Sequence, residues 1–351
     1  MSRSMKSARL KELDSLRGFA ALSVVIYHFT TGYSDLIGWR EGNLFLRFNF
    51  VRAGIAVFFV ISGFVIFYSL QNVRKPLDFL LSRISRLIPP YYAAMSITIF
   101  IITVGPFNFR HVGLLDIPAN LIMAAPIFKS ATIDGPYWTL TREILFYFTI
   151  SIFYFIIGRD RVLYCLMGWL LLSISLNMYL EIENYYWITG VGSAIMLVTN
   201  GQFSYLFVIG IVLYKIWSGD RSVVVMVTLA LALVASGFSE WPSHHHFSLA
   251  NLGSTLAYTA TVAITVIWRP SVLRWPVLVW FGTISYSLYL IHETLGFYVI
   301  HVLQSKNVDA NICVAVACAS VIAVAALLQR FVEVPGRAWV MQRYRSMQVK
   351  T

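Results

Sequence analysis

Charged residues are scarce in this chain of 351 residues, and their scarcity sets its class. They make up 12% of the chain, about half the share of a typical soluble domain, while hydrophobic residues make up 58%. This composition excludes a soluble globular protein and indicates a membrane protein without a sizeable soluble domain. We therefore expect an all-α integral membrane protein.

Cysteine is also rare, and the cysteines that are present have no pattern. Cys165, Cys313 and Cys318 all fall in apolar stretches, so neither a disulfide framework nor a CxxC site is predicted. The run of histidines at 244–246 has no further clustered ligands beside it, so we predict no metal site.

Acidic residues are outnumbered by basic ones, which gives a formal net charge of +11. In a soluble protein this excess would suggest a nucleic-acid partner. In a membrane protein the positive-inside rule explains basic loops more simply, so we expect no nucleic-acid partner. The basic amino terminus precedes an apolar stretch that contains Arg17 and His28 and has no AxA-like exit. We therefore expect an uncleaved first span and not a signal peptide.

Apolar stretches of spanning length predict about ten transmembrane helices. They lie near residues 14–32, 51–70, 87–105, 138–157, 162–180, 200–217, 223–239, 249–268, 280–303 and 310–331. Most lysines and arginines fall in the tails and in alternate loops, which places both termini in the cytoplasm. We expect one domain over 1–351, with a core at 12–335 and short cytoplasmic tails at 1–11 and 336–351. Its predicted location is the cell (inner or cytoplasmic) membrane, as a multi-pass protein.

Two connecting segments are longer than plain turns. Residues 106–137 contain IPANLIMAAPIF, which is too short to span, so we expect a re-entrant or interfacial helix that lines a cavity. Residues 181–199 are expected to be similar. No internal repeat indicates the inverted halves of a transporter.

Polar residues recur at one depth inside the predicted spans. Arg17 and His28 are eleven residues apart, so an ideal helix places them on one face, about 16 Å apart along its axis. Counting along the other spans puts Glu143, His292 and Glu293 at the depth of His28, in the outer half of the membrane. Charges facing lipid are costly, so these groups are expected to face one polar cavity.

A different chemistry is predicted at the cytoplasmic rim. Arg83 and Arg86 are neighbours on one helix face, and Arg17 lies at a similar depth. Three guanidiniums suit a phosphate-bearing ligand, and the separation of about 16 Å is close to the reach of a pantetheine arm. A coenzyme A thioester bound from the cytoplasm could therefore present its acyl group to His28. Alternatively, Arg83 and Arg86 anchor the helix in anionic headgroups, and Arg17 pairs with Asp14.

Six stretches together resemble the acyltransferase 3 family of multispanning membrane acyltransferases. They are LDSLRGFAALSVVIYH (13–28), FFVISGF (58–64), RISRLIPPYY (83–92), YWTLTREILFY (137–147), FGTISYSLYLIH (281–292) and FVEVPGR (331–337). Members include enzymes that O-acetylate lipopolysaccharide O-antigen, exopolysaccharide and nodulation factors. Many members of that family carry an acidic residue shortly before the FFVxSG stretch, where Ala56 stands in this chain. Because the chain ends soon after the last predicted span, we expect a member without the periplasmic domain that some relatives carry.

The resemblance implies a membrane O-acyltransferase. It would transfer an acyl group, first of all acetyl, from cytoplasmic acetyl-CoA to a hydroxyl of an envelope or exported polysaccharide or of a lipid-linked glycan. Its partners would be acyl-CoA, the glycan and membrane lipid. The predicted catalytic residues are His28 and Glu143, and the predicted coenzyme A ligands are Arg17, Arg83 and Arg86. Predicted to bind substrate or to support the site are Asp14, Trp138, Ser285, Tyr286 and His292.

Several roles stay open at this point. His28 acts as a general base or as a nucleophile that carries the acyl group, with Glu143 orienting it. His292 holds the acceptor or polarises the thioester carbonyl. In the alternative interpretations, His28 and His292 only pack helices, and Glu143 forms a salt bridge with Arg142 or Arg52.

Other functions are also open. The alternative class is a proton-coupled secondary transporter, and a purely structural scaffold is the third. Within the first class, the donor could be succinyl-CoA and the acceptor a small molecule. The oligomeric state is not predicted.

Overall fold

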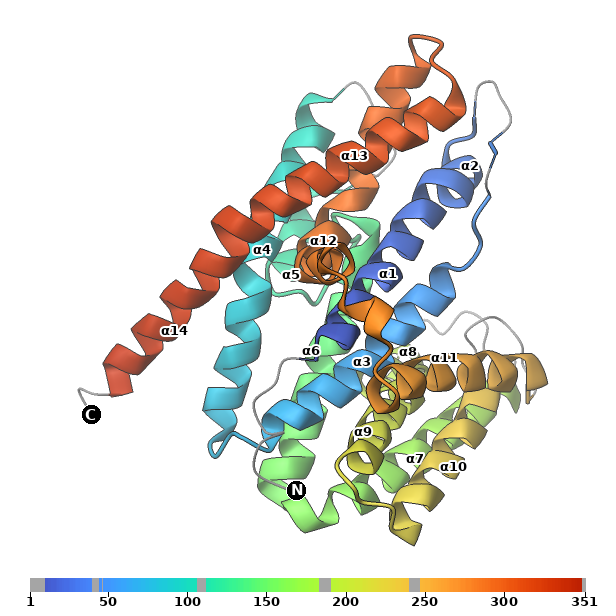
Figure 1. The fold of residues 1–351 in the computed structure, drawn as a ribbon, viewed down its shortest axis with the longest axis vertical. Coiled ribbons are helices and arrows are strands. Elements are labelled where there is room, and N and C mark those ends of the chain that lie inside the picture. Colours follow the sequence, from blue (N-terminus) through green and yellow to red (C-terminus); the bar gives the residue numbers. More distant parts are fainter. Residues whose placement is uncertain are drawn as a thin grey trace.

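The computed structural model describes residues 10–39, 44–45, 47–105, 112–182, 191–239 and 247–348. All regular structure in these ranges is helical (Figure 1), as the composition predicted. The longer helices are α1 (Lys11–Tyr27), α3 (Val51–Leu70), α4 (Pro76–Val104), α6 (Trp138–Ser151), α7 (Val162–Ile182), α9 (Ser204–Trp217), α10 (Val223–Gly237), α11 (Leu249–Ile267), α12 (Pro276–Gln304), α13 (Ala310–Leu328) and α14 (Val334–Gln348). Short helices lie between them, namely α2 (Tyr33–Leu36), α5 (Ile117–Leu121) and α8 (Val191–Val198).

Six of the described helical segments are long and apolar enough to cross a membrane. They are Val51–Leu70, Pro76–Val104, Gly135–Ile157, Arg159–Met178, Leu249–Ile267 and Ala310–Gln348. Large apolar side chains also cover the outside of the helices, and Ile156, Val223 and Leu249 are each more than 70% exposed. Lipid is the solvent that suits such a surface, so the chain is a membrane protein. The number of ten spans and the cytoplasmic termini stay predictions.

The last helix is longer than the predicted span at 310–331. α13 passes through a π-helical turn at Gln329–Glu333 into α14, and Figure 1 shows the two as one rod along one side of the molecule. A Cβ added to Gly336 would lie 2.6 Å from Cβ of Pro89, so α14 packs closely on α4. The lipid-facing stretch therefore ends after Phe331, where the hydropathy falls, but the helix continues. Much of the predicted tail at 336–351 is helical, as far as Gln348.

α4 also extends beyond its predicted bounds of 87–105. It begins at Pro76, because proline needs no hydrogen-bond acceptor in a first turn, and it continues through Pro89 and Pro90. Arg83 and Arg86 consequently lie inside this helix, on one face of which their spacing predicted them to be neighbours.

The connection after α4 is more compact than predicted. Residues 106–111 lie outside the described part, and α5 has only five residues where a longer re-entrant helix was expected. The turns around it are fixed by Asn120, whose Nδ2 donates to the carbonyls of Asp116 at 2.9 Å and Ala131 at 2.8 Å. Side-chain amides can close a turn in this way without a helix, which a hydropathy pattern does not show.

Glycines let α1 and α12 touch along their length. A Cβ on Gly18 would lie 2.8 Å from the backbone nitrogen of Gly282, and a Cβ on Gly282 would lie 2.0 Å from the carbonyl oxygen of Asp14. Further along, a Cβ on Gly296 would lie 2.0 Å from the ring of Phe29. Small residues at a helix crossing permit such backbone contact. The contact holds the middle of α12 against the end of α1, where the histidines meet.

A buried carboxylate anchors the beginning of α1. Glu12 is 1% exposed, and it accepts hydrogen bonds from Nε of Arg269 at 3.0 Å and Nε of Arg274 at 2.6 Å. The two arginines belong to the segment between α11 and α12, so this contact adds to the pairing of α1 with α12. We call the end of the molecule at which α1 begins the inner end, and the opposite end the outer end. In the predicted orientation the inner end faces the cytoplasm.

Candidate active site

The structure brings the three predicted coenzyme A ligands together. Arg17, Arg83 and Arg86 line one small pocket of about 30 Å³, which we call the arginine pocket. Arg17 comes from α1, and the other two come from successive turns of α4. Convergence of two helices on one pocket was predicted from depth alone. Binding of coenzyme A by these residues stays a prediction.

A wider cavity of about 520 Å³, the mouth cavity, opens at the inner end. Arg17 and Arg86 line it as well, together with Arg337, Asp14 and Glu333. Arg337 and Glu333 were not predicted as site residues. The motif FVEVPGR contains both, but its predicted place at the end of the last span gave no reason to expect them at a cavity. They reach it because the helix continues through this motif along α4.

A third cavity of about 50 Å³, the central pocket, continues outward from Arg17. Glu143, Ser285, Tyr286 and Tyr289 also line it. Since Arg17 lines the mouth cavity, the arginine pocket and the central pocket, all three adjoin at this one residue. Together they form a path from the inner end toward the middle of the fold.

Glu143 lies on this path and not beside His28. Its Oε1 accepts a hydrogen bond from Oγ of Ser62 at 3.2 Å and another from the hydroxyl of Tyr147. The alternative salt bridge with Arg142 is not formed, because Arg142 donates instead to the carbonyl of Leu197 at 3.2 Å. Glu143 therefore faces the arginines, and its predicted role of orienting His28 is not what this geometry favours.

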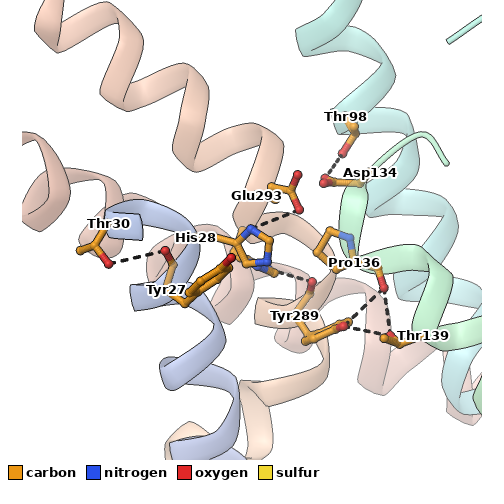
Figure 2. Close-up of polar contacts among 10 residues, drawn as sticks. Tyr27, His28, Thr30, Thr98, Asp134, Pro136, Thr139, Tyr289 and Glu293 are labelled. Carbon is orange, nitrogen blue, oxygen red and sulfur yellow. Dashed lines mark hydrogen bonds and ion pairs between the residues drawn. The ribbon is translucent and has the colours of Figure 1, made fainter. Parts of the chain in front are cut away.

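The carboxylate in contact with His28 is that of Glu293 (Figure 2). Nδ1 of His28 lies 3.4 Å from Oε2 of Glu293, which is longer than an ordinary hydrogen bond but within ion-pair distance. Glu293 is 1% exposed, and the side chain of His28 is 18% exposed. A buried carboxylate at Nδ1 favours the tautomer that has its proton on Nδ1, which leaves Nε2 as the basic atom. This is the geometry of a histidine that accepts a proton from a substrate.

A local change of helix type occurs at this histidine. α1 ends at Tyr27, and residues His28–Gly32 form a π-helical turn. Such turns are rare, and they are frequent at functional sites because they redirect one side chain out of the regular helical pattern. Figure 2 shows the His28 side chain directed at α12, between Glu293 and Tyr289.

His292 completes the pair of histidines. Its ring lies 5.0 Å from that of His28, edge to face, and its Nδ1 lies 2.9 Å from the carbonyl oxygen of Tyr289. A carbonyl can only accept, so Nδ1 carries the proton, and Nε2 of the neutral ring is an acceptor. This Nε2 is buried and has no hydrogen-bond partner in the described part of the chain. His292 is therefore arranged to accept a hydrogen bond from a hydroxyl, and not to donate one to a thioester carbonyl.

Tyr289 lines the central pocket and also packs against His292. Its hydroxyl forms a hydrogen bond of 2.9 Å with Oγ1 of Thr139 (Figure 2). Its ring centroid lies 5.7 Å from that of His292. Tyr289 was not predicted as a site residue, although it lies within the quoted stretch 281–292. It is the side chain that a substrate arm reaching from the central pocket to His28 would have to pass.

The remaining predicted residues have mainly structural contacts. Oγ of Ser285 donates to the carbonyl of Gly282 at 2.8 Å, and the Tyr286 hydroxyl donates to the carbonyl of Leu87 at 3.1 Å. The ring of Trp138 packs at 5.6 Å on that of Phe203. Ser285 and Tyr286 nevertheless line the central pocket, whereas Asp14 lies at the mouth cavity.

The described part of the structure gives little support for a metal site. Among the described residues, no group of three or more histidine, cysteine, aspartate or glutamate side chains could hold a metal ion. The histidine run at 244–246 lies outside the described part. The predicted absence of a metal stays a prediction.

Comparisons with known proteins agree with the motifs. Residues 10–330 match the family model described as an acyltransferase domain. A Staphylococcus aureus (strain COL) protein, provisionally named an O-acetyltransferase, is 25% identical over 371 residues, which cover 93% of this chain and 57% of that protein. The exopolysaccharide production protein ExoZ of Rhizobium meliloti (strain 1021) is 27% identical over 228 residues, which cover 54% of this chain and 70% of ExoZ.

The chain thus spans little more than half the length of its Staphylococcus aureus relatives. No solved structure matches it. The family model covers most of the chain, and residues of the stretches that carry the resemblance line one connected set of cavities, among them Arg17, Arg83, Arg86 and Glu143. The chain therefore belongs to the acyltransferase 3 family of membrane proteins.

Proposed function

We propose that the chain is a membrane O-acyltransferase that moves an acetyl group from cytoplasmic acetyl-CoA to a hydroxyl of an exported or envelope glycan. The observation that carries the proposal is the arrangement of two different sites along one path. Arg17 lines all three inner cavities, and the pair His28–Glu293 lies beyond Tyr289. The names of the relatives, an O-acetyltransferase and an exopolysaccharide production protein, support the reaction and the class of acceptor.

The donor would bind with its phosphates at the arginines of the inner end. Arginine suits phosphate because its planar fork forms paired, charge-assisted hydrogen bonds. α1 is continuous from Lys11 to Tyr27, so the axial distance from Arg17 to His28 is about 16 Å. A pantetheine arm of similar reach would bring the thioester to His28. The central pocket of about 50 Å³ is too narrow for the arm as it stands, so entry requires Tyr289 to turn aside.

Acyl transfer then needs one base. Nε2 of His28 takes the proton from the acceptor hydroxyl as its oxygen attacks the thioester carbonyl carbon. The carbon–sulfur bond breaks, and the departing thiolate of coenzyme A takes the proton back from His28. Glu293 stabilises the imidazolium that exists between these two steps. Nε2 of His292 accepts a hydrogen bond from a second hydroxyl of the glycan and so positions the attacking oxygen beside His28.

Transfer of label from radiolabelled acetyl-CoA tests this proposal. Membranes that contain the wild-type chain should label added exopolysaccharide or lipid-linked oligosaccharide, and His28→Ala should lower the rate by about 10² to 10⁴-fold. His301→Ala is the matched control, because this histidine lies on α12 nine residues beyond His292, away from the contact between His28 and Glu293. It should retain the wild-type rate.

Two further outcomes separate the alternatives. Label bound covalently to the protein in the absence of acceptor would replace the general base with an acyl-histidine intermediate. An absence of His28-dependent labelling with any short-chain acyl-CoA would contradict the acyltransferase proposal. The histidine–glutamate cluster would then be tested as a proton pathway.

A further inference from the structure

The mouth cavity contains an arginine that the proposed chemistry does not use. Arg337 lies on α14 and lines this cavity but not the arginine pocket, whereas Arg83 lines only the arginine pocket. Arg17 and Arg86 line both spaces. The inner end therefore presents two positions for an anion, which share two arginines and differ in the third.

The position of Arg337 is built into the fold. α14 continues α13 without a break, and the close approach of Gly336 to Pro89 sets the next residue, Arg337, beside α4. None of Arg17, Arg86 and Arg337 forms a hydrogen bond or an ion pair with another described residue. Three guanidiniums that converge on one cavity repel one another, and a bound anion relieves that repulsion.

Two acidic residues, Asp14 and Glu333, line the same cavity but leave the anion position open. Oε2 of Glu333 accepts a hydrogen bond from Oγ of Ser287 at 2.8 Å, so this carboxylate is held toward α12. The three arginines still exceed the two carboxylates. The cavity, at about 520 Å³, is also of the size that takes a nucleotide, unlike the arginine pocket of about 30 Å³.

The order of the cavities along α1 matches the order of groups in a coenzyme A thioester. The mouth cavity is lined by Leu10, Leu13 and Asp14, which all precede Arg17 on the chain and lie nearer the inner end. If the diphosphate lies level with Arg17, the ribose of the donor and its 3′-phosphate must lie farther inward. Arg337 is the arginine that lines this cavity and does not line the arginine pocket.

We propose that Arg337 binds the ribose 3′-phosphate of the acyl-CoA donor, so that the enzyme distinguishes coenzyme A thioesters from 3′-dephospho-coenzyme A thioesters. This inference rests on the proposed function. Arg83 contacts the diphosphate instead and contributes to binding of both donors. The same guanidinium chemistry would also suit the phosphate of an anionic lipid headgroup, so the test includes that source.

The test is donor specificity of the full chain in vesicles of phosphatidylcholine alone. With the wild type, acetyl-CoA should have a KM about tenfold or more below that of acetyl-3′-dephospho-CoA, which is the usual effect of a charge-assisted hydrogen bond. Arg337→Gln should raise the KM for acetyl-CoA by about the same factor, with kcat unchanged. The KM for the dephosphorylated donor should stay within about twofold. Arg343→Gln is the matched control, because Arg343 lies on the same helix but over the ring of Trp339 and away from the cavity.

Equal effects of Arg337→Gln on both donors, or no effect on either, would overturn the inference. If Arg337→Gln loses activity only in vesicles that contain phosphatidylglycerol, and loses it equally with both donors, Arg337 binds lipid headgroups. This result would overturn the inference as well. Equilibrium binding of coenzyme A and 3′-dephospho-coenzyme A separates this failure from failure of the proposed function. Equal binding of both compounds by the wild type refutes only the inference, whereas binding of neither refutes the donor and the inference together.

Discussion

Replacement of Glu293 by glutamine tests which carboxylate supports His28. Glutamine keeps the shape of the side chain and removes its charge, so the contact with Nδ1 of His28 persists without the attraction to an imidazolium. The two atoms lie 3.4 Å apart. At an effective dielectric constant of about 20, their attraction is about 5 kcal/mol, which limits the effect to between three and four orders of magnitude in rate. Because His28 is 18% exposed and water screens part of the charge, we expect kcat to fall by about 10² to 10³-fold.

The matched control is Glu143→Gln. Glutamine can still accept hydrogen bonds from Ser62 and Tyr147, and the lost charge faces Arg17 in the donor path. We therefore expect Glu143→Gln to change the KM for acetyl-CoA more than kcat. The assay is steady-state acetyl transfer by purified protein in vesicles, with thermal unfolding to show that both variants fold.

The reverse result would refute this reasoning. If Glu293→Gln keeps more than about a third of kcat while Glu143→Gln loses at least 10²-fold, the carboxylate that supports catalysis is Glu143. The contact between His28 and Glu293 would then be a packing contact.

Three other predictions concern packing, donor binding and pH. Gly282→Ala should lower the thermal unfolding midpoint by several degrees, because its Cβ would lie 2.0 Å from a carbonyl oxygen of α1, whereas Gly253→Ala, with nothing within 4 Å of its Cβ, should not lower it. The double variant Arg83→Ala, Arg86→Ala should raise the KM for acetyl-CoA at least tenfold and recover activity at high donor concentration; unrecoverable activity would assign these arginines to the chemistry. Burial raises the pKa of Asp220, in the turn after α9, but hydrogen bonds from the backbone and side chains around it lower that pKa by more, to below its usual 3.8. The resulting stabilisation is complete above about pH 5 and is lost as the pH falls through the folded-state pKa, so Asp220→Asn should cost less than about 1 kcal/mol at pH 6 and nothing near pH 2, as measured by thermal unfolding.

Residue spacing along a single helix predicted part of the site correctly. The interval between Arg17 and His28, and that between Arg83 and Arg86, place side chains on known faces at known depths. Those depths were enough to predict that the arginines gather at one end and that His28 and His292 lie level. The family was predicted by the resemblance of the six stretches, taken together and in their order along the chain.

The choice of carboxylate could not be predicted, because depth says nothing about rotation of a helix about its axis. Glu143 and Glu293 were both assigned the depth of His28. The glycine contacts at Gly18 and Gly282 decide that α12 is the helix that lies against α1, and they thereby favour Glu293. These glycines were visible in the motifs, but their partners across the helix crossing were not.

Arg337 was missed for a different reason. Hydropathy falls after Phe331, so the segment was interpreted as a tail, whereas packing on Pro89 of α4 keeps it helical. A helix that leaves the lipid can continue wherever another helix supports it. Hydropathy reports how well a segment suits lipid, and it does not report packing against another helix.

The sidedness of the donor site tests the central claim most directly. Sealed vesicles of opposite orientation, inside-out and right-side-out, would each receive radiolabelled acetyl-CoA, which does not cross a bilayer, and labelled glycan would be measured for the wild type and for His28→Ala. We predict label only in inside-out vesicles, where the arginine-lined mouth cavity faces the added donor, and only with His28 present. His28-dependent labelling in intact right-side-out vesicles alone would contradict the account, because the donor would then enter from the histidine side.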